Sequence, residues 1–218
     1  MRYSGRIISL LIVAISSLGL IIYNFATNGH LDMIHIIVSI FYIFFGWWLG
    51  KQYDKVKYYS EKDLLTECYN RRFVKNIFPK LKSQSDRNSE KFVVFIIDVD
   101  DFKSINDLHD HAMGDRVLQL ISHVLTNTFR RTDYVARWGG DEFLVLLPYA
   151  DELGMNELQN RLHNDLNTLS NVGSLEVSVS VGYAIYPDEG NGLNDLIKVA
   201  DRKMYSEKRG KDGKLKGV

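Results

Sequence analysis

The sequence predicts an α/β fold, a sandwich in which helices flank a mixed central sheet, preceded by two transmembrane helices. The first observation is that residues 1–50 carry only three formal charges, on Arg2, Arg6 and Asp32. The second is a run of six apolar residues, Phe92–Ile97, which is typical of a strand buried on both faces. The third is that segments of helical periodicity alternate with strand-like segments beyond this run, which favours an α/β arrangement.

Composition excludes several classes of protein. The chain has 218 residues, 45% hydrophobic and 25% charged, and this balance is globular rather than disordered or collagen-like. Its 27 basic and 27 acidic side chains cancel, so the overall charge gives no sign of a nucleic-acid partner, and we expect none. The single cysteine, Cys68, permits no intramolecular disulfide and fits a reducing compartment.

Two uncharged stretches at the start of the chain have the length of membrane spans. They are Ile7–Gly29 and Met33–Gly50, and the second ends in Trp47 and Trp48, where an interfacial aromatic belt would lie. A helix of about 20 residues crosses the hydrocarbon core of a bilayer. The alternatives are a cleaved signal peptide and a buried soluble helix. Because one apolar stretch follows the other so closely, we favour a two-helix membrane hairpin at residues 1–50.

The positions of the basic residues predict how this hairpin is oriented. Arg6 flanks the first span and Lys51 follows the second, whereas the connection at 24–32 has no Lys or Arg. By the positive-inside rule both termini are expected in the cytoplasm, as in a multi-pass protein of a bacterial-type inner membrane. His35, the ionisable group within a span, is either a sensing group or a neutral residue near the interface, and the second interpretation is preferred.

Residues 51–64 are expected to form a helical stalk. Tyr53, Val56 and Tyr59 repeat there at helical spacing, and this face is suited to pairing with a second copy. The repeat is too short to predict a coiled coil, which needs several heptads.

Residues 65–218 are expected to form one α/β domain. The expected elements, in order, are a strand at Phe92–Ile97, a helix at 117–129, strands at Tyr134–Arg137 and Phe143–Leu147, a helix at 158–166, a strand at Glu176–Tyr186 and a helix at 193–204. The pair Gly139–Gly140 suits a tight hairpin turn between the second and third strands.

Two acidic pairs mark the expected site. Asp98 and Asp100 follow the buried strand, and Asp141 and Glu142 lie on the hairpin turn. The pairs meet if the hairpin lies beside that strand. Each pair alone is also compatible with a solvated turn, but carboxylates that gather repel one another unless a cation neutralises them. Oxygen ligands suit Mg²⁺, which commonly shares itself with substrate phosphates, and two such ions can activate a hydroxyl and stabilise a leaving phosphate.

Phosphate also needs positive partners. Lys103, just after the buried strand, and Lys208, near the end of the last helix, are candidates, although a surface lysine is the alternative for either.

The segment RWGGDEF at Arg137–Phe143 resembles the signature hairpin of the GGDEF-family diguanylate cyclases. Four further segments resemble the family: DLLTECYNRR at Asp63–Arg72, IDVDDFKSINDLHDHAMGD at Ile97–Asp115, VSVSVGYAIYP at Val177–Pro187 and ADRKMYSEK at Ala200–Lys208. The resemblance extends from about residue 60 to about residue 212. It implies the mixed sheet of the nucleotide-cyclase-like GGDEF fold.

The resemblance implies a reaction at a homodimer interface. Two GTP molecules on facing domains are joined by attack of each 3′-hydroxyl on the other's α-phosphate, which gives cyclic di-GMP and two pyrophosphates. The implied cofactor is Mg²⁺, with Mn²⁺ as a substitute, at two ions per GTP. Asp98, Asp141 and the carbonyl of Val99 would bind the metal, and Glu142 would lie at the reacting end.

The resemblance also implies substrate contacts and an inhibitory site. The substrate contacts are Lys103 and Lys208 for phosphates, Asn106 and Asp115 for guanine, and Gly139 and Gly140 for close approach of the backbone. Arg130 and Asp133, in the segment RRTD, match the inhibitory site that binds the product cyclic di-GMP. A surface ion pair at a helix end is the alternative for these two residues.

Four features depart from the family pattern, and one of them is Asp101, where the family usually has an apolar residue. Glu67 and Asp110 stand where the family usually has glycine, and the spacing of Lys211 from Lys208 is one residue tighter than usual. The alternative function is therefore a catalytically silent GGDEF module that binds GTP or cyclic di-GMP. A cyclic GMP–AMP synthase is disfavoured, because Asp115 is the acidic residue that the resemblance assigns to guanine recognition.

Overall fold

The structure is a computed structural model that describes residues 3–30, 33–148, 154–170 and 177–215. The chain divides into two compact units, Met1–Ser60 and Glu61–Val218. Each unit is described by itself.

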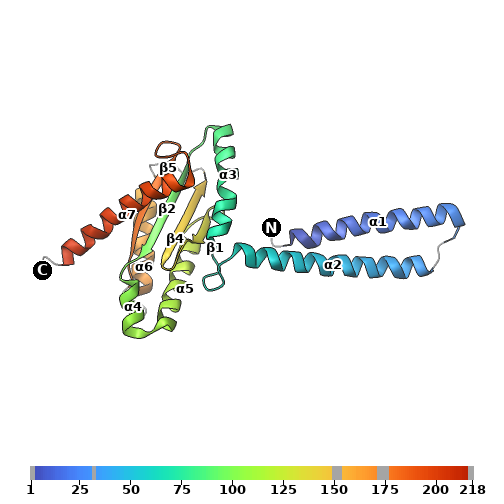
Figure 1. The fold of residues 1–218 in the computed structure, drawn as a ribbon, viewed down its shortest axis with the longest axis horizontal. Helices are drawn as coiled ribbons and strands as arrows, with labels where there is room; N and C mark the ends of the chain where they lie inside the picture. Colours follow the sequence, from blue (N-terminus) through green and yellow to red (C-terminus); the bar gives the residue numbers. More distant parts are fainter. Residues whose placement is uncertain (1–2, 31–32, 149–153, 171–176, 216–218) are drawn as a thin grey trace. The chain divides into compact units, whose positions relative to one another are not determined.

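The first unit is a helical hairpin. Helix α1 (Ser4–Asn28) lies antiparallel to α2 (Met33–Glu61), as Figure 1 shows. Both helices are long and apolar enough to cross a membrane, so the unit is compatible with membrane anchoring. Helix α2 runs without a break from the second apolar stretch into the expected stalk.

Polar contacts join the two helices of the hairpin at both ends. The Asp54 carboxylate accepts from the backbone N–H of Gly5 at 2.7 Å and forms an ion pair with Arg6 Nε at 3.3 Å. At the other end, Asn24 Nδ2 lies 3.1 Å from His35 Nδ1. His35 therefore has a polar partner on α1.

The second unit is built on a five-stranded mixed sheet. Its strands are β1 (Tyr69–Asn70), β2 (Phe92–Val99), β3 (Tyr134–Arg137), β4 (Glu142–Pro148) and β5 (Val179–Tyr186). Their spatial order is β1-β3-β4-β2-β5. The β1–β3 pair is parallel, and the other three pairs are antiparallel. This arrangement confirms the predicted fold class.

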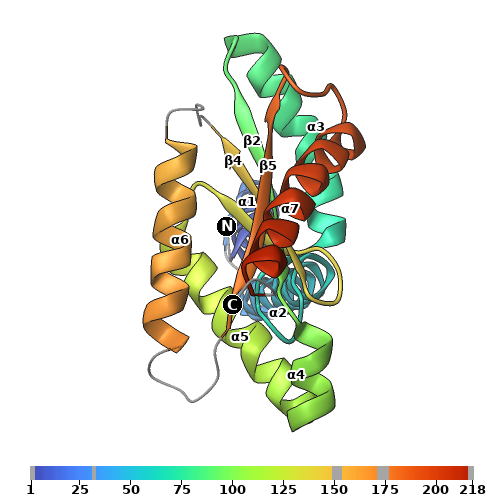
Figure 2. The ribbon, with the colours of Figure 1, turned by 90° about the vertical axis from the view of Figure 1, so that its left-hand side faces the viewer.

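Helices cover both faces of the sheet. They are α3 (Arg71–Asn88), α4 (Phe102–His109), α5 (His111–Thr128), α6 (Met155–Ser170) and α7 (Leu193–Leu215). Figure 2 shows α5 and α6 on one side of the sheet, and α3 and α7 on the other. Strand β2 alternates between two cores, with Val93 and Phe95 facing α5 and α6 and Phe92 and Val94 facing α3 and α7. The prediction of a strand buried on both faces is confirmed.

The structure adds elements that hydrophobic periodicity did not indicate. Helices α3 and α4 were not expected, and α5 begins at His111, earlier than the predicted helix at 117–129. Strand β5 begins at Val179, whereas the predicted strand began at Glu176, which lies outside the described residues. Cys68 is buried, and burial raises the pKa of its thiol.

Candidate functional site

The site lies where the central strand β2 ends. Asp98 is the register partner of Glu142 on β4 and of Ser180 on β5. The backbone N–H of Val99 donates to the carbonyl oxygen of Asp141 at 3.3 Å. The hairpin of β3 and β4 therefore brings the two acidic pairs together at one end of the sheet, as the sequence predicted.

The negative charges at this end of the sheet are incompletely balanced. Burial raises the pKa of Glu142, and the charges of Asp201 and Asp98 raise it further, although Arg71 acts in the opposite direction. Burial also raises the pKa of Asp201, and the charge of Asp98 adds to this effect. A bound cation would relieve the repulsion.

The donor atoms suit a hard cation. Asp98 and Asp141 supply carboxylate oxygens and Val99 a carbonyl oxygen, which are the ligands that Mg²⁺ takes. Among the described residues, no group of three or more His, Cys, Asp or Glu side chains is already arranged to hold a metal ion. The donor set therefore fits Mg²⁺ if substrate phosphates and water supply the remaining ligands, as is usual for this ion.

Lys208 on α7 reaches into the same cluster. Its ammonium forms an ion pair with Asp98. Burial acts to lower the pKa of Lys208, but the hydrogen bond and the charge of Asp98 outweigh burial and raise it. Lys208 is therefore a cation that shares the Asp98 carboxylate with any bound metal. Lys211 lies further along α7, beyond the described side chains.

The expected guanine contacts lie at the corner between α4 and α5. A Cβ atom on Gly114 would lie 3.0 Å from Cγ of Asn106, so glycine is what lets the start of α5 pass against the Asn106 side chain. Asp115 is the next residue and is exposed. Lys103 is exposed on the first turn of α4, just after β2. The corner thus brings Asn106 and the segment of Asp115 together.

Both residues that replace a family glycine have a positive φ. The φ angle is 56° at Glu67 and 123° at Asp110. Asp110 has ψ of 168°, in a region that is essentially restricted to glycine. Its side chain accepts from the backbone N–H of Met113 at 2.8 Å and so caps α5. The backbone therefore keeps the geometry that glycine would favour, with strain at the corner between α4 and α5.

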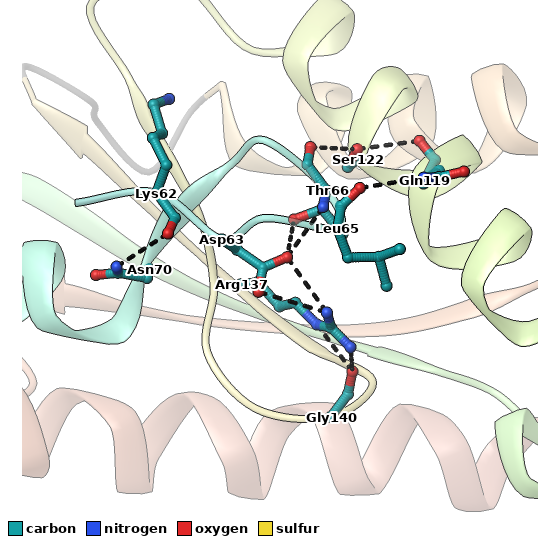
Figure 3. Close-up of polar contacts among 9 residues, drawn as sticks. All are labelled: Lys62, Asp63, Leu65, Thr66, Asn70, Gln119, Ser122, Arg137 and Gly140. Carbon is teal, nitrogen blue, oxygen red and sulfur yellow. Dashed lines mark hydrogen bonds and ion pairs between the residues drawn. The ribbon is translucent and has the colours of Figure 1, made fainter. Parts of the chain in front are cut away.

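The hairpin turn is held by Arg137. Its Nη2 and Nε donate to the carbonyl oxygen of Gly140 at 2.8 and 3.1 Å, and its Nη1 donates to Asp63 Oδ1 at 3.2 Å (Figure 3). A Cβ on Gly139 would lie 2.9 Å from Glu142 Oε2, so this glycine leaves room for the Glu142 carboxylate. Gly140 has open space around it.

Asp63 in turn belongs to a segment that is tied to α5. Its Oδ1 accepts from the backbone N–H of Thr66 at 3.0 Å and from the Thr66 hydroxyl at 2.7 Å. Burial acts to raise the pKa of Asp63, but these hydrogen bonds and the charge of Arg137 hold it below its ordinary value. The carbonyl oxygens of Leu65 and Thr66 accept from Gln119 and Ser122 on α5 (Figure 3).

The expected inhibitory pair forms a turn just before β3. The Asp133 carboxylate accepts from the backbone N–H of Arg130 at 2.8 Å, and the N–H of Asp133 donates to the carbonyl oxygen of Arg130 at 2.9 Å. Burial raises the pKa of Asp133. Arg130 itself is exposed. The hydrogen bonds between the two residues thus use the backbone of Arg130, and the charge of Arg130 also acts on the Asp133 carboxylate.

Three residues of the site were missed in the sequence. Asp201 lies seven residues before Lys208, two helical turns on the same face, and this spacing could have found it. Asp63 and Arg137 are 74 residues apart, and no local pattern joins them. Their contact depends on how β1 and β3 pair.

A sequence profile described as "Diguanylate cyclase, GGDEF domain" matches residues 60–214. Diguanylate cyclase DosC of Escherichia coli K12 is 36% identical over 154 residues, which cover 67% of this chain and 33% of DosC. Probable diguanylate cyclase DgcC of the same strain is 30% identical over 182 residues, 79% of this chain and 49% of DgcC. The cyclic di-GMP phosphodiesterase PdeR is also 30% identical, over 164 residues. The chain thus spans a third to a half of the length of these two cyclases.

Solved structures show the same similarity. Diguanylate cyclase SiaD of Pseudomonas aeruginosa, solved with its activator SiaC, has a TM-score of 0.67 and 29% identity, covering 79% of this chain and 67% of SiaD. The GGDEF domain of YfiN from the same organism has a TM-score of 0.63 and 34% identity, covering 68% of this chain and 89% of that domain.

Proposed function

The chain belongs to the GGDEF family of diguanylate cyclases, and on that premise we propose that it condenses two GTP molecules into cyclic di-GMP. The observation that carries the proposal is the pairing of Asp98 with Glu142 at the end of β2, with Lys208 bound to Asp98. This pairing places acidic ligands for a cation and a basic group for phosphate side by side at the end of β2.

Each half-reaction replaces one P–O bond with another and releases one proton to solvent. The 3′-oxygen of one GTP bonds to the α-phosphorus of the other and loses its proton, while the bond from that phosphorus to the bridging oxygen of pyrophosphate breaks. Bound Mg²⁺, held by Asp98, Asp141 and the carbonyl of Val99, would neutralise charge on the phosphates and activate the hydroxyl. Glu142 would lie at the end of this metal site where the reaction takes place.

The protein's own residues then position the nucleotide. Lys208 and Lys103 hold phosphates, and the open space at Gly140 admits phosphate close to the backbone. Asn106 and Asp115 bind the guanine edge, where a carboxylate accepts from the ring N–H and the exocyclic amine. Because one domain carries one GTP, closure of the ring requires a homodimer with two facing sites.

Regulation and location are part of the same proposal. Exposed Arg130 and partly buried Asp133 would bind cyclic di-GMP and hold two domains in an unproductive arrangement. The hairpin of α1 and α2 would anchor the domain to the inner membrane with both termini in the cytoplasm. Extraction of membranes with alkaline carbonate tests the anchoring, because an integral protein stays with the lipid.

A silent binding module is the second candidate. The strained φ of Asp110, at the corner where guanine is expected, favours it. A phosphodiesterase among the relatives also means that membership of the family alone does not establish synthesis.

The deciding experiment uses the full-length protein in detergent with GTP and Mg²⁺, followed by mass-resolved chromatography. Asp98→Ala and Asp141→Ala are the controls. Cyclic di-GMP made by the wild type and by neither variant supports the cyclase. No product from a folded dimer contradicts it and favours the silent module.

A further inference from the structure

Glu207 on α7 makes contacts with two other elements at the edge of the sheet. Its Oε2 accepts from Gln159 Nε2 of α6 at 2.7 Å and from the backbone N–H of Val181 in β5 at 3.3 Å. Its Oε1 lies 3.3 Å from His163 Nε2, one turn along α6 from Gln159. We call these four residues the Glu207 cluster.

The Glu207 cluster joins elements from opposite faces of the sheet. Figure 2 shows α6 and α7 on either side of β5. Strand β5 is an edge strand of the sheet. Leu162 on α6 and Leu196 on α7 are buried in different cores. A side chain that reaches from α7 past the edge of β5 to α6 therefore fixes the distance of α7 from the sheet.

Helix geometry connects this cluster to the proposed site. Glu207 is followed directly by Lys208, whose ammonium binds Asp98. Adjacent residues of an α-helix point about 100° apart, so the rotation that directs Glu207 to the edge of β5 also directs Lys208 over the sheet. Lysine is a point charge on a flexible four-carbon stem, so its placement depends strongly on where its Cα is held.

We propose that Glu207 is a positioning residue, which holds α7 so that Lys208 meets Asp98 and the phosphates of bound GTP. This inference rests on the proposed function, because it concerns how that site binds its substrate. The contacts of Glu207 named above go to α6 and β5, and Lys208 is the neighbouring residue that binds Asp98. Its effect is therefore expected to pass through Lys208.

A double-mutant cycle tests this dependence. The full-length protein in detergent is assayed for KM of GTP and kcat as wild type, Glu207→Ala, Lys208→Ala and the double variant. We expect Glu207→Ala to raise KM about five- to tenfold, the scale of one coupled contact, with a smaller change in kcat. In a background of Lys208→Ala, the same change is expected to have no further effect on KM.

Two variants separate positioning from general stability. Glu189 also caps the edge of β5, since it accepts from the N–H of Ile185 at 3.0 Å and pairs with Lys203 of α7 at 2.8 Å. Glu189→Ala removes a comparable contact one turn earlier on α7, and we expect KM to stay near the wild-type value. Glu207→Gln keeps an acceptor oxygen for Val181, so we expect it to restore most of the affinity.

Hydrogen exchange gives a readout that does not depend on activity. Glu207→Ala should speed exchange at Val181 and along α7 near Lys208, and Glu189→Ala should speed it at Ile185 instead. Unchanged exchange in Glu207→Ala, or effects of Glu207→Ala and Lys208→Ala that simply multiply, overturns the inference. A wild-type protein that neither binds nor converts GTP would refute the proposed function and this inference with it. An active wild type with an unaltered Glu207→Ala variant would refute the inference alone.

Discussion

Asp98 and Glu142 are register partners in the antiparallel pair of β2 and β4, so two carboxylates from distant parts of the sequence share one end of the sheet. Asp98 already binds Lys208, and Glu142 has a raised pKa because it is buried beside other acids. A site of this kind is stabilised by added positive charge.

Asp141→Ala is expected to reduce Mg²⁺-dependent synthesis of cyclic di-GMP by at least about 100-fold, since loss of even an outer-shell partner costs 10- to 100-fold. The fold should persist, because Asp141 lies on a turn and is only partly buried. Product formation and thermal unfolding measured on the same sample check both parts. Unaltered synthesis would remove Asp141 from the metal site.

Asp201→Asn is expected to raise the melting temperature by about 2 °C at neutral pH without Mg²⁺. The pKa of Asp201 is higher in the folded state, so folding favours its protonated form. Stability linked to this group is full at low pH and is lost as pH rises through the folded pKa. The gain from Asp201→Asn should shrink when Mg²⁺ neutralises the site. A gain that is the same with and without Mg²⁺ would contradict this picture.

Asp63→Asn is expected to weaken the acid dependence of stability. The pKa of Asp63 lies below its ordinary value of 3.8 in the folded state, so its contribution is present above that pH and is lost as pH falls through the folded pKa. Unfolding midpoints in urea between about pH 5 and pH 3 measure the difference from wild type. Arg137→Ala should show a smaller change in the same direction, because it removes the charge of Arg137 but leaves the Thr66 hydrogen bonds that lower the pKa of Asp63 more. If the unfolding midpoints of all three proteins fall equally with pH, Asp63 does not contribute to the acid dependence of stability.

Asp110→Gly is expected to increase the free energy of unfolding by about 1 kcal/mol. It relieves a backbone strain of about 1–3 kcal/mol, and loss of the cap to Met113 costs only a few tenths with glycine at that position. Asp110→Asn is the control, because it keeps both the cap and the strained φ. Denaturant unfolding of the three proteins gives the comparison, and a glycine variant less stable than wild type would refute the assignment of strain.

Arg130→Ala is expected to raise the concentration of cyclic di-GMP that halves the rate by at least about tenfold, as loss of a charge-assisted contact to phosphate should. Arg131→Ala is a matched control, because Arg131 is also exposed and is the next residue. A dose–response curve of the Arg130 variant identical to that of wild type would remove the inhibitory site.

Much of the fold followed from local patterns. The apolar run Phe92–Ile97 identified the central strand, and periodicity identified the helix that includes Val117 and Ile121. Helices α3 and α4 were not predicted, because each has only a short apolar stripe and more polar than apolar residues. The acidic pairs were predicted to meet, and they do, because strands joined by a tight turn have few ways to pair beside a buried strand.

The sequence alone identified the family, the apolar hairpin, the central strand and the acids that follow it. Each of these is recognised from a pattern of contiguous residues. Tertiary structure alone decided that Arg137 binds Asp63 and that Glu207 reaches Gln159 and Val181 across the edge of β5. These contacts join residues that the chain separates, and they form only because β1 pairs with β3 and because α6 and α7 pack on opposite faces of the sheet.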